Sequence, residues 1–474
     1  MERQHKKRKV VASGEEPRCV VHDVPADLLR LILLRLDSPL WLFRAACVCK
    51  RWRHIVDGAD RGRAFLHLAS SLHPPAVVGH YQNNVGGSRR FVPSSSLPAP
   101  INGSRFSLDF IPHNFVTGTT PIDNWEVADC HGGLVLLREG SGFLSDLVIC
   151  DPLTARCRRI HHPPGQGIHR RRSPGVAAGY YLANVFLIDG DDGNTSISNF
   201  RVLYRSDNDD EYIGSQLYVF SMADGGGFGN WRFLRRSQLD DRYRDGFGRV
   251  AGRVDGSLYL GLHTGVMTVL DKDKLEFSKV DLPPIHRNVR STFAVVHGAA
   301  AGTDPTSPSP PVVCIVHVHG QTLELFRQVR GSGEWVLQHR IPELSRATRG
   351  LPGYPDHKRF WWQMVEVIAG GTGFAILSAW VSDRGTSMTW LFSFNVDTME
   401  LQAVTNEAAY CAKKTVTSTY TLPWPRFLRS GRSLLKPKSI SLIKANPSIF
   451  QYLHASYPRV TYSTKCHAIT SNKC

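Results

Sequence analysis

The sequence lacks long apolar runs, a secretory leader and paired cysteines. None of its 474 residues lies in an apolar stretch near the 18 or so that a membrane helix needs. The opening residues, MERQHKKRKV, have no apolar core behind them. The ten cysteines include no CxxC pair and show no regular spacing, which favours reduced thiols. These absences predict a soluble protein that works inside the cell.

Motifs of catalysis and cofactor binding are also missing. There is no GxSxG, HExxH or P-loop pattern. The segment VIAGGTGFAI is like a dinucleotide loop, but Ile376 stands where the third glycine is needed, so we expect a β-turn. GGGFG at 225–229 is likewise expected to be a hairpin loop. The pairs His161–His162 and His317–His319 have no carboxylate or cysteine at metal-ligand spacing. We therefore predict no catalytic residue, no cofactor and no metal site.

Acidic residues are scarce at both ends of the chain. Residues 1–18 carry six bases and three acids, and residues 431–474 carry seven bases and no acid. The two ends thus supply +10 of the formal net charge of +16, which leaves a modest charge on the body. A disordered basic tail is expected over 1–18, and a basic flexible extension over 429–474. This distribution makes nucleic-acid binding by the body unlikely.

The first tail contains a candidate nuclear-import signal. Lys6, Lys7, Arg8 and Lys9 form a cluster of the kind that docks in an acidic receptor groove. A merely solvating basic tail is the alternative. The expected location is the nucleus, the cytoplasm or both.

Residues 20–66 show apolar residues at helical spacing. In VPADLLRLILLRLD, apolar side chains recur every three or four positions, which predicts a helix opened by Pro25. Ser38 and Pro39 predict the start of a second helix through Leu42, and a third is expected through KRWRHIV, ending at Asp57–Gly58. Three short helices bury little apolar surface, so a remaining apolar face favours a partner protein.

The stretch AACVCKRWRHIV (45–56) admits several chemistries. Cys47 and Cys49 are too close for a metal knuckle, and no second Cys/His pair lies nearby. A nucleic-acid helix could use its bases, but its flanks are apolar and acids follow at once. Together with the two preceding helices, the stretch resembles the F-box family, with Val24 where a leucine is usual before Pro25.

This resemblance implies an adaptor role. F-boxes insert into a Skp-family adaptor, which connects to a cullin scaffold and a RING-bound conjugating enzyme. The resemblance implies that ten residues contact the adaptor or pack beside it: Pro25, Leu28, Leu29, Ile32, Leu36, Pro39, Leu42, Val48, Cys49 and Trp52. Some of these could instead only hold the three helices together, Trp52 and Val48 first among them.

Beyond residue 75 the helical period gives way to short β-like runs between turn clusters. A loose unit of strands and a polar hairpin recurs at 130–164, 254–284, 313–343 and 370–404, and 216–236 fits half of another. No clean unit is found between 75 and 125. The spacing predicts a kelch-like β-propeller of six or seven blades over 75–428, with a pair of β-sandwiches as the alternative. AAAGTDPTSPSPP (299–311) is expected to be an insertion between blades.

The β region also resembles the propeller-like substrate domains of plant F-box proteins, through CHGGLVLL, DLVICDPLT and the closing LPWP. The whole chain is therefore expected to be a non-catalytic substrate receptor of an SCF-type cullin-RING ubiquitin ligase, which binds an unknown target protein. Two alternatives remain open. One is a basic nuclear protein that binds nucleic acid through its tails, and the other is a carbohydrate-modifying propeller enzyme, for which no ligand set is found.

Overall fold

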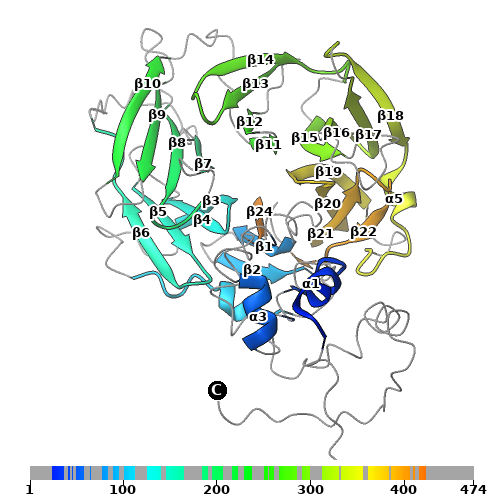
Figure 1. Cartoon of the computed structure of the whole chain (residues 1–474). Helices are drawn as coiled ribbons and strands as arrows, with labels where there is room; N and C mark the ends of the chain where they lie inside the picture. Colours follow the sequence, from blue (N-terminus) through cyan, green and yellow to red (C-terminus); the bar gives the residue numbers. More distant parts are fainter. Residues whose placement is uncertain are drawn as a thin grey trace, which may run out of the picture. The chain divides into compact units, whose positions relative to one another are not determined.

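A computed structural model of the chain describes two units, each treated by itself. One contains the helices between residues 24 and 65, and the other contains the strands from Val77 onward (Figure 1). The described residues are 24–36, 41–42, 45, 50–57, 65, 77–83, 89–94, 101–112, 125–139, 146–164, 184–189, 195–206, 216–222, 229–236, 250–254, 256–260, 266–285, 291–298, 312–329, 332–355, 361–383, 386–405, 409–410 and 416–422. No helix among them is long and apolar enough to cross a membrane.

The helical unit contains α1 (Ala26–Leu34) and α3 (Lys50–Asp57). Pro25, with φ −54°, is the N-cap residue of α1, and its carbonyl accepts the hydrogen bond of the Leu29 amide. Trp41, Leu42 and Ala45, between α1 and α3, are helical. These positions agree with the helices predicted from the apolar spacing, and α3 ends at Asp57 as expected.

The β unit is a propeller of six antiparallel sheets. The five sheets in the middle of the chain have the strand orders β3–β6, β10–β7, β11–β14, β15–β18 and β19–β22, with β23 added beside β21. Their strands are β3 (Trp125–His131), β4 (Leu134–Glu139), β5 (Leu147–Asp151), β6 (Arg156–Ile160), β7 (Asn184–Ile188), β8 (Phe200–Ser206), β9 (Gln216–Met222), β10 (Asn230–Arg236), β11 (Val250–Val254), β12 (Ser257–Leu260), β13 (Val266–Asp271), β14 (Phe277–Asp281), β15 (Ser291–Gly298), β16 (Val312–His319), β17 (Thr322–Gln328), β18 (Trp335–Ile341), β19 (Trp361–Gly370), β20 (Phe374–Asp383), β21 (Thr386–Asn395), β22 (Leu401–Ala403) and β23 (Ala409–Tyr410).

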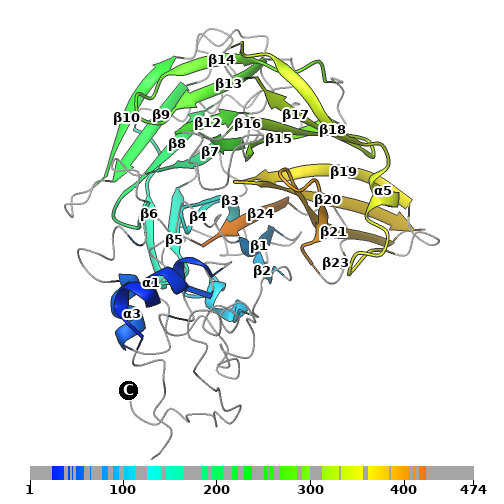
Figure 2. The ribbon, with the colours of Figure 1, turned by 45° about the vertical axis from the view of Figure 1, so that its right-hand side comes forward.

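The sixth sheet joins the two ends of the propeller. Its described strands are β1 (Val77–Asn83), β2 (Arg89–Pro93) and β24 (Val416–Thr421), in the order β2-β1-β24. β24 pairs with β1 on one side and lies next to β3 of the following blade (Figure 2). The ring is therefore closed by backbone hydrogen bonds between strands more than three hundred residues apart.

The blade count of six confirms the propeller prediction and excludes the two sandwiches. The repeat was not visible at 75–125 because the blade formed there takes its inner strand, β24, from the far end of the chain. The expectation for 299–311 was wrong. β15 and β16 pair with each other over their whole length, so this segment joins two strands of one blade.

The hydrophobic core lies between neighbouring blades. One cluster joins β3–β6 to β7–β10, and others continue between the following pairs. The inner strands approach closely: a Cβ at Gly252 of β11 would lie 2.0 Å from the carbonyl oxygen of Val295 on β15. Only glycine permits this approach, because it has no side chain to displace the neighbouring backbone.

The outer hairpins share one turn. Asp151, Asp271 and Asn395 each accept hydrogen bonds through Oδ1 from the two amides that follow two and three residues later. Four residues after each of them, Ala155, Leu275 and Met399 have φ between 51° and 61°. Asp and Asn favour such turns because the side chain accepts local backbone hydrogen bonds. Three of the polar hairpins recognised in the sequence, those in 130–164, 254–284 and 370–404, contain these turns.

Candidate functional site

Helix α1 has one buried face and one accessible flank, both apolar. Leu29, Ile32 and Leu33 are buried at the i, i+3, i+4 spacing of one helical face, and Leu36, two residues after the end of α1, is also buried. Leu28 is half-buried and Leu31 is 55% exposed on the adjoining flank. Single exposed leucines are common, but two neighbours on one helix form a small apolar surface.

The buried face of α1 packs within the helical unit. Trp41, Leu42 and Ala45, and Trp52 and Val56 of α3, are also buried. The Arg51 guanidinium donates a hydrogen bond to the Val24 carbonyl, which fixes α3 to the start of α1. The guanidinium carbon of Arg30 lies 5.7 Å from the centre of the Phe65 ring, a cation–π contact. These contacts stabilise the helices against one another.

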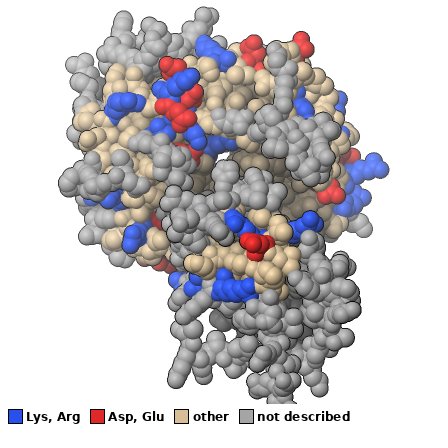
Figure 3. Space-filling view, viewed as in Figure 1, with Lys and Arg blue, Asp and Glu red and all other residues tan. Residues whose placement is uncertain are grey.

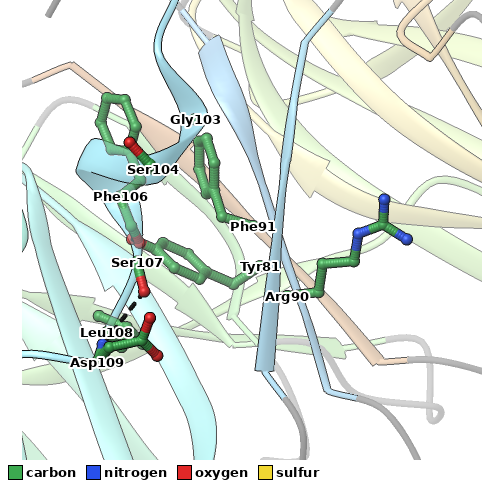
Figure 4. Close-up of a pocket in the computed structure, with 9 residues that line it drawn as sticks. All are labelled: Tyr81, Arg90, Phe91, Gly103, Ser104, Phe106, Ser107, Leu108 and Asp109. Atoms are coloured by element: carbon green, nitrogen blue, oxygen red, sulfur yellow. Dashed lines mark hydrogen bonds between the residues drawn. The ribbon is translucent and has the colours of Figure 1, made fainter.

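The blade formed by β1, β2 and β24 holds a cavity of about 300 Å³ (Figure 4). Its floor is aromatic: the Phe91 and Phe106 rings stack with their centres 4.6 Å apart, and the Tyr81 hydroxyl donates to the Phe106 carbonyl at 2.7 Å. The 3₁₀ turn η2 (Gly103–Phe106) forms one wall. In Figure 4, Arg90 points away from these rings. The two phenylalanine rings stack on each other, and the Tyr81 hydroxyl already donates to a backbone carbonyl. This cavity is therefore mainly a consequence of packing within the blade.

A second cavity of about 160 Å³ lies among β3, β7 and β11 and is lined by charged side chains. Asp189 Oδ1 lies 2.6 Å from His131 Nε2, and Lys272 Nζ donates to Asp189 Oδ2 at 2.5 Å. Burial alone would raise the pKa of the Asp189 carboxyl. The hydrogen bonds and charges of His131 and Lys272 outweigh burial and lower this pKa well below its usual range.

Asp129 makes a parallel set of contacts beside this cavity. Its Oδ2 accepts hydrogen bonds from the Leu187 amide at 2.8 Å and from the Arg253 guanidinium at 2.5 Å. Arg253 also donates to the Leu187 carbonyl at 3.3 Å. Both carboxylates are thus satisfied by neighbouring blades, and the cluster joins three blades. Among the described residues no group of three or more His, Cys, Asp or Glu side chains could hold a metal ion.

Comparison with known families identifies the helical unit. A family model described as the F-box domain matches residues 21–63. These residues are an F-box domain. The match agrees with the predicted domain, and with the propeller it supports the main features of the predicted architecture.

Other comparisons add similarity at the level of overall structure only. No curated protein matches the chain in sequence. The chain is similar to TolB from Acinetobacter baumannii, at 8% identity and TM-score 0.34, over 76% of this chain and 73% of that one. It is also similar to the β-propeller domain of Nup133 from Vanderwaltozyma polyspora, at 9% identity and TM-score 0.31, over 62% and 69%.

The F-box residues named from the sequence fall into two groups in the structure. Leu29, Ile32, Leu36, Leu42 and Trp52 are buried in the unbound chain. Pro25 is exposed and Leu28 is half-buried. Pro39, Val48 and Cys49 lie outside the described residues, as do Lys6, Lys7, Arg8 and Lys9 of the basic tail and the whole of 1–18 and 429–474.

Sequence reasoning missed several contacts that need the fold. Leu31 belongs to the leucine-rich run, but its exposure depends on which arc of α1 the other helices cover. Glu324 lies 3.2 Å from buried His317 because β16 and β17 pair in that register. Asp146 contacts Arg159, His161 and His162 across the β5–β6 hairpin, and their hydrogen bonds and charges overcome burial to lower the pKa of its carboxyl. None of these pairs is marked by local spacing.

Proposed function

We propose that this protein is a non-catalytic substrate receptor of an SCF-type cullin-RING ubiquitin ligase. The F-box binds a Skp-family adaptor, which connects the chain to a cullin scaffold, and the propeller binds a target protein. The observation that carries the proposal is an F-box with an accessible apolar flank on α1, in the same chain as a six-bladed propeller.

The exposed flank of α1 is the proposed adaptor contact. Burying a leucine side chain contributes about 1.5–3 kcal/mol. Pro25, Leu28 and Leu31, together with the residues around Pro39, Val48 and Cys49, would supply the apolar contact that offsets the cost of association. Leu29, Ile32, Leu36, Leu42 and Trp52 act through the helix packing that presents this surface.

The receptor acts by raising effective concentration. A target held by the propeller stays near the conjugating enzyme that the adaptor and scaffold bring to the complex, so transfer becomes effectively intramolecular. Propellers suit this task because rigid blades present loops and strand edges in fixed positions. This role requires no catalytic residue of the receptor itself.

Binding to a recombinant Skp-family adaptor tests the proposal. Leu28→Asp with Leu31→Asp should abolish co-purification, because two charges replace an accessible apolar surface. Phe233→Asp, at a side chain of the propeller that is 49% exposed, is the matched control and should bind like wild type. A double variant that folds and still retains the adaptor at wild-type level would contradict the F-box contact. Steeply salt-dependent retention on DNA after removal of both tails would instead favour the nucleic-acid alternative.

The basic N-terminal cluster is proposed to direct the protein to the nucleus. Replacing Lys6, Lys7, Arg8 and Lys9 with alanine should move a fluorescent fusion from the nucleus to the cytoplasm. An unchanged distribution would show that the tail has no import role.

A further inference from the structure

The outer strands of the four four-stranded blades and of the five-stranded blade β19–β23 are protected to different degrees against pairing with another chain. Exposed strand edges are usually protected by charges, prolines, bulges or short length. β6 contains Arg156, Arg158 and Arg159; β10 contains Arg232, Arg235 and Arg236; β14 contains Lys279 and Asp281; β22 has only three residues. β18 has seven residues, WVLQHRI, and Arg340 is its only Lys, Arg, Asp or Glu.

β18 also exposes apolar side chains on both of its faces. Val336 is 52% exposed and pairs with Arg327, whereas Leu337 is 45% exposed and pairs with Phe326. As neighbours in a strand they point to opposite faces. Val329, in the hairpin before the strand, is 41% exposed. Both faces of this edge therefore offer apolar surface to an added strand.

The start of β18 is held in place by the neighbouring blade. Trp335 Nε1 donates to the Asp281 carbonyl at the end of β14, at 2.8 Å. Pairing with β17 is regular from Trp335 to Leu337, and the register then shifts between Leu337 and His339. The edge most suitable for an added strand is therefore the fixed segment Trp335–Leu337.

The two ends of this edge differ in charge. Glu334 precedes β18 and is exposed, whereas Arg340, near the end of the strand, is 61% exposed and lies 3.6 Å from the Glu324 carboxylate, which offsets part of its charge. Arg346 of α5 (Leu344–Ala347) and Arg349 just after it are also exposed, and one acid, Glu343, is exposed directly before α5. Figure 3 shows basic side chains, with acidic ones beside them, at the right-hand rim, where Figure 1 places α5. The far end of β18 thus favours an acidic partner.

We propose that the outer edge of β18 binds an extended segment of a target protein as a fifth antiparallel strand. The segment carries apolar residues against Val336 and Leu337 and acidic residues at its N-terminal end, where an antiparallel strand meets Arg340, Arg346 and Arg349. Main-chain hydrogen bonds supply affinity, and the side chains supply specificity. The proposal deepens the target-binding role proposed above and rests on it.

A second copy of the chain is the competing occupant. Two rigid propellers joined at so short a regular edge would bury far less than the ~1,200 Å² of a stable interface. A flexible segment can fold over both faces of the edge and reach the arginines beyond it. The geometry therefore favours a peptide segment over a dimer.

Peptide binding to the full chain in complex with its adaptor tests this assignment. The probe is a fluorescein-labelled peptide, Asp-Glu-Glu-Val-Thr-Val-Thr-Val, compared with one that has three lysines in place of the acids. We expect the acidic peptide to bind at least about tenfold more tightly, a difference of about 1.4 kcal/mol. Val336→Lys with Leu337→Lys, and separately Arg346→Glu with Arg349→Glu, should each weaken it about tenfold. Phe233→Lys on β10, an equally exposed side chain, should leave binding unchanged.

Several results would overturn the assignment. Two concern the peptides: neither peptide binds, or both bind equally. A third is that the variant with Val336→Lys and Leu337→Lys binds the acidic peptide within twofold of wild type. A fourth is that the wild-type chain forms a dimer that this variant abolishes. Protection of the amides of 335–337 from hydrogen exchange by the acidic peptide would support it. Adaptor binding is measured on the wild type and on every variant. A folded wild-type chain that does not bind the adaptor counts against the F-box proposal, whereas a β18 variant that loses the peptide and keeps the adaptor counts for the β18 edge.

Discussion

Tyr420 of β24 offers the sharpest test of how the propeller ring is closed. Its side chain is fully buried, and its hydroxyl donates to the Gly133 carbonyl of the next blade at 2.9 Å. Its ring packs edge-on against Phe106, with centres 5.4 Å apart, and against Tyr81 at 5.9 Å. Tyr420→Phe leaves the ring in place and removes the hydroxyl that makes this hydrogen bond.

The expected loss can be worked out from the structure. A buried carbonyl that loses its partner costs about 1–3 kcal/mol. Unfolding of a domain that spans residues 77–422 carries an entropy of roughly 0.7 kcal/mol/K, from about 2.1 cal/mol/K per residue. Tyr420→Phe should therefore lower the Tm of the propeller by about 1.5–4 °C. Tyr420→Ala, which also opens a cavity worth about 3–5 kcal/mol, should lower it by at least about 4–7 °C.

The chain contains a matched control in Tyr204. This tyrosine is equally buried, but its hydroxyl has no hydrogen-bond partner within the described part of the chain. Burial raises its pKa to about 12, which keeps the hydroxyl neutral. Tyr204→Phe should leave the Tm unchanged or raise it. By calorimetry, a Tyr420→Phe transition that matches wild type, or a Tyr204→Phe loss as large as that of Tyr420→Phe, would refute the reasoning.

Three further predictions concern the propeller. His80 is fully buried on β1, and burial lowers its pKa to about 4, so the unfolded chain binds a proton at a higher pH than the folded chain does. The free energy of unfolding should therefore fall by about 3 kcal/mol from pH 7 to pH 4. In urea titrations, His80→Gln should lose the part of this pH dependence that comes from His80. Asp189→Asn should lower the free energy of unfolding by about 2 kcal/mol, because Lys272 loses its half-buried charged partner; an unchanged urea midpoint would contradict the account of the charged cluster. Gly252→Ala should lower the free energy of unfolding by more than about 2 kcal/mol or prevent folding. Gly320 has a φ of 62° and open space where a Cβ would be added, so Gly320→Ala should lower the same quantity by about 1 kcal/mol in the same titration.

The parts of the fold that depend on neighbouring residues could be predicted from the sequence. The leucines of α1 show their period directly, and the turns at Asp151, Asp271 and Asn395 follow from local side-chain chemistry. The blade formed by β1, β2 and β24 could not be predicted in this way. β24 pairs with β1 although more than three hundred residues separate the two strands, and no local sequence pattern indicates such a contact.

The same limit applies to the residues of the candidate F-box site. Apolar spacing located the F-box helices, but it could not separate residues that pack inward from those that face out. Leu36 and Leu31 have the same chemistry, yet one is 2% and the other 55% exposed. For this reason a charge at Leu36 would test folding, whereas a charge at Leu31 tests binding. The protection of strand edges likewise became visible only once the outer strand of each blade was known.

Reconstitution of the ligase assembly tests the central claim most directly. The full chain, a recombinant Skp-family adaptor and the adaptor-binding domain of a cullin are mixed and separated by size-exclusion chromatography with light scattering. We predict a single 1:1:1 complex that forms only when the adaptor is present and is lost with Leu28→Asp and Leu31→Asp. A folded chain that elutes apart from the adaptor and the cullin at micromolar concentration would contradict the account.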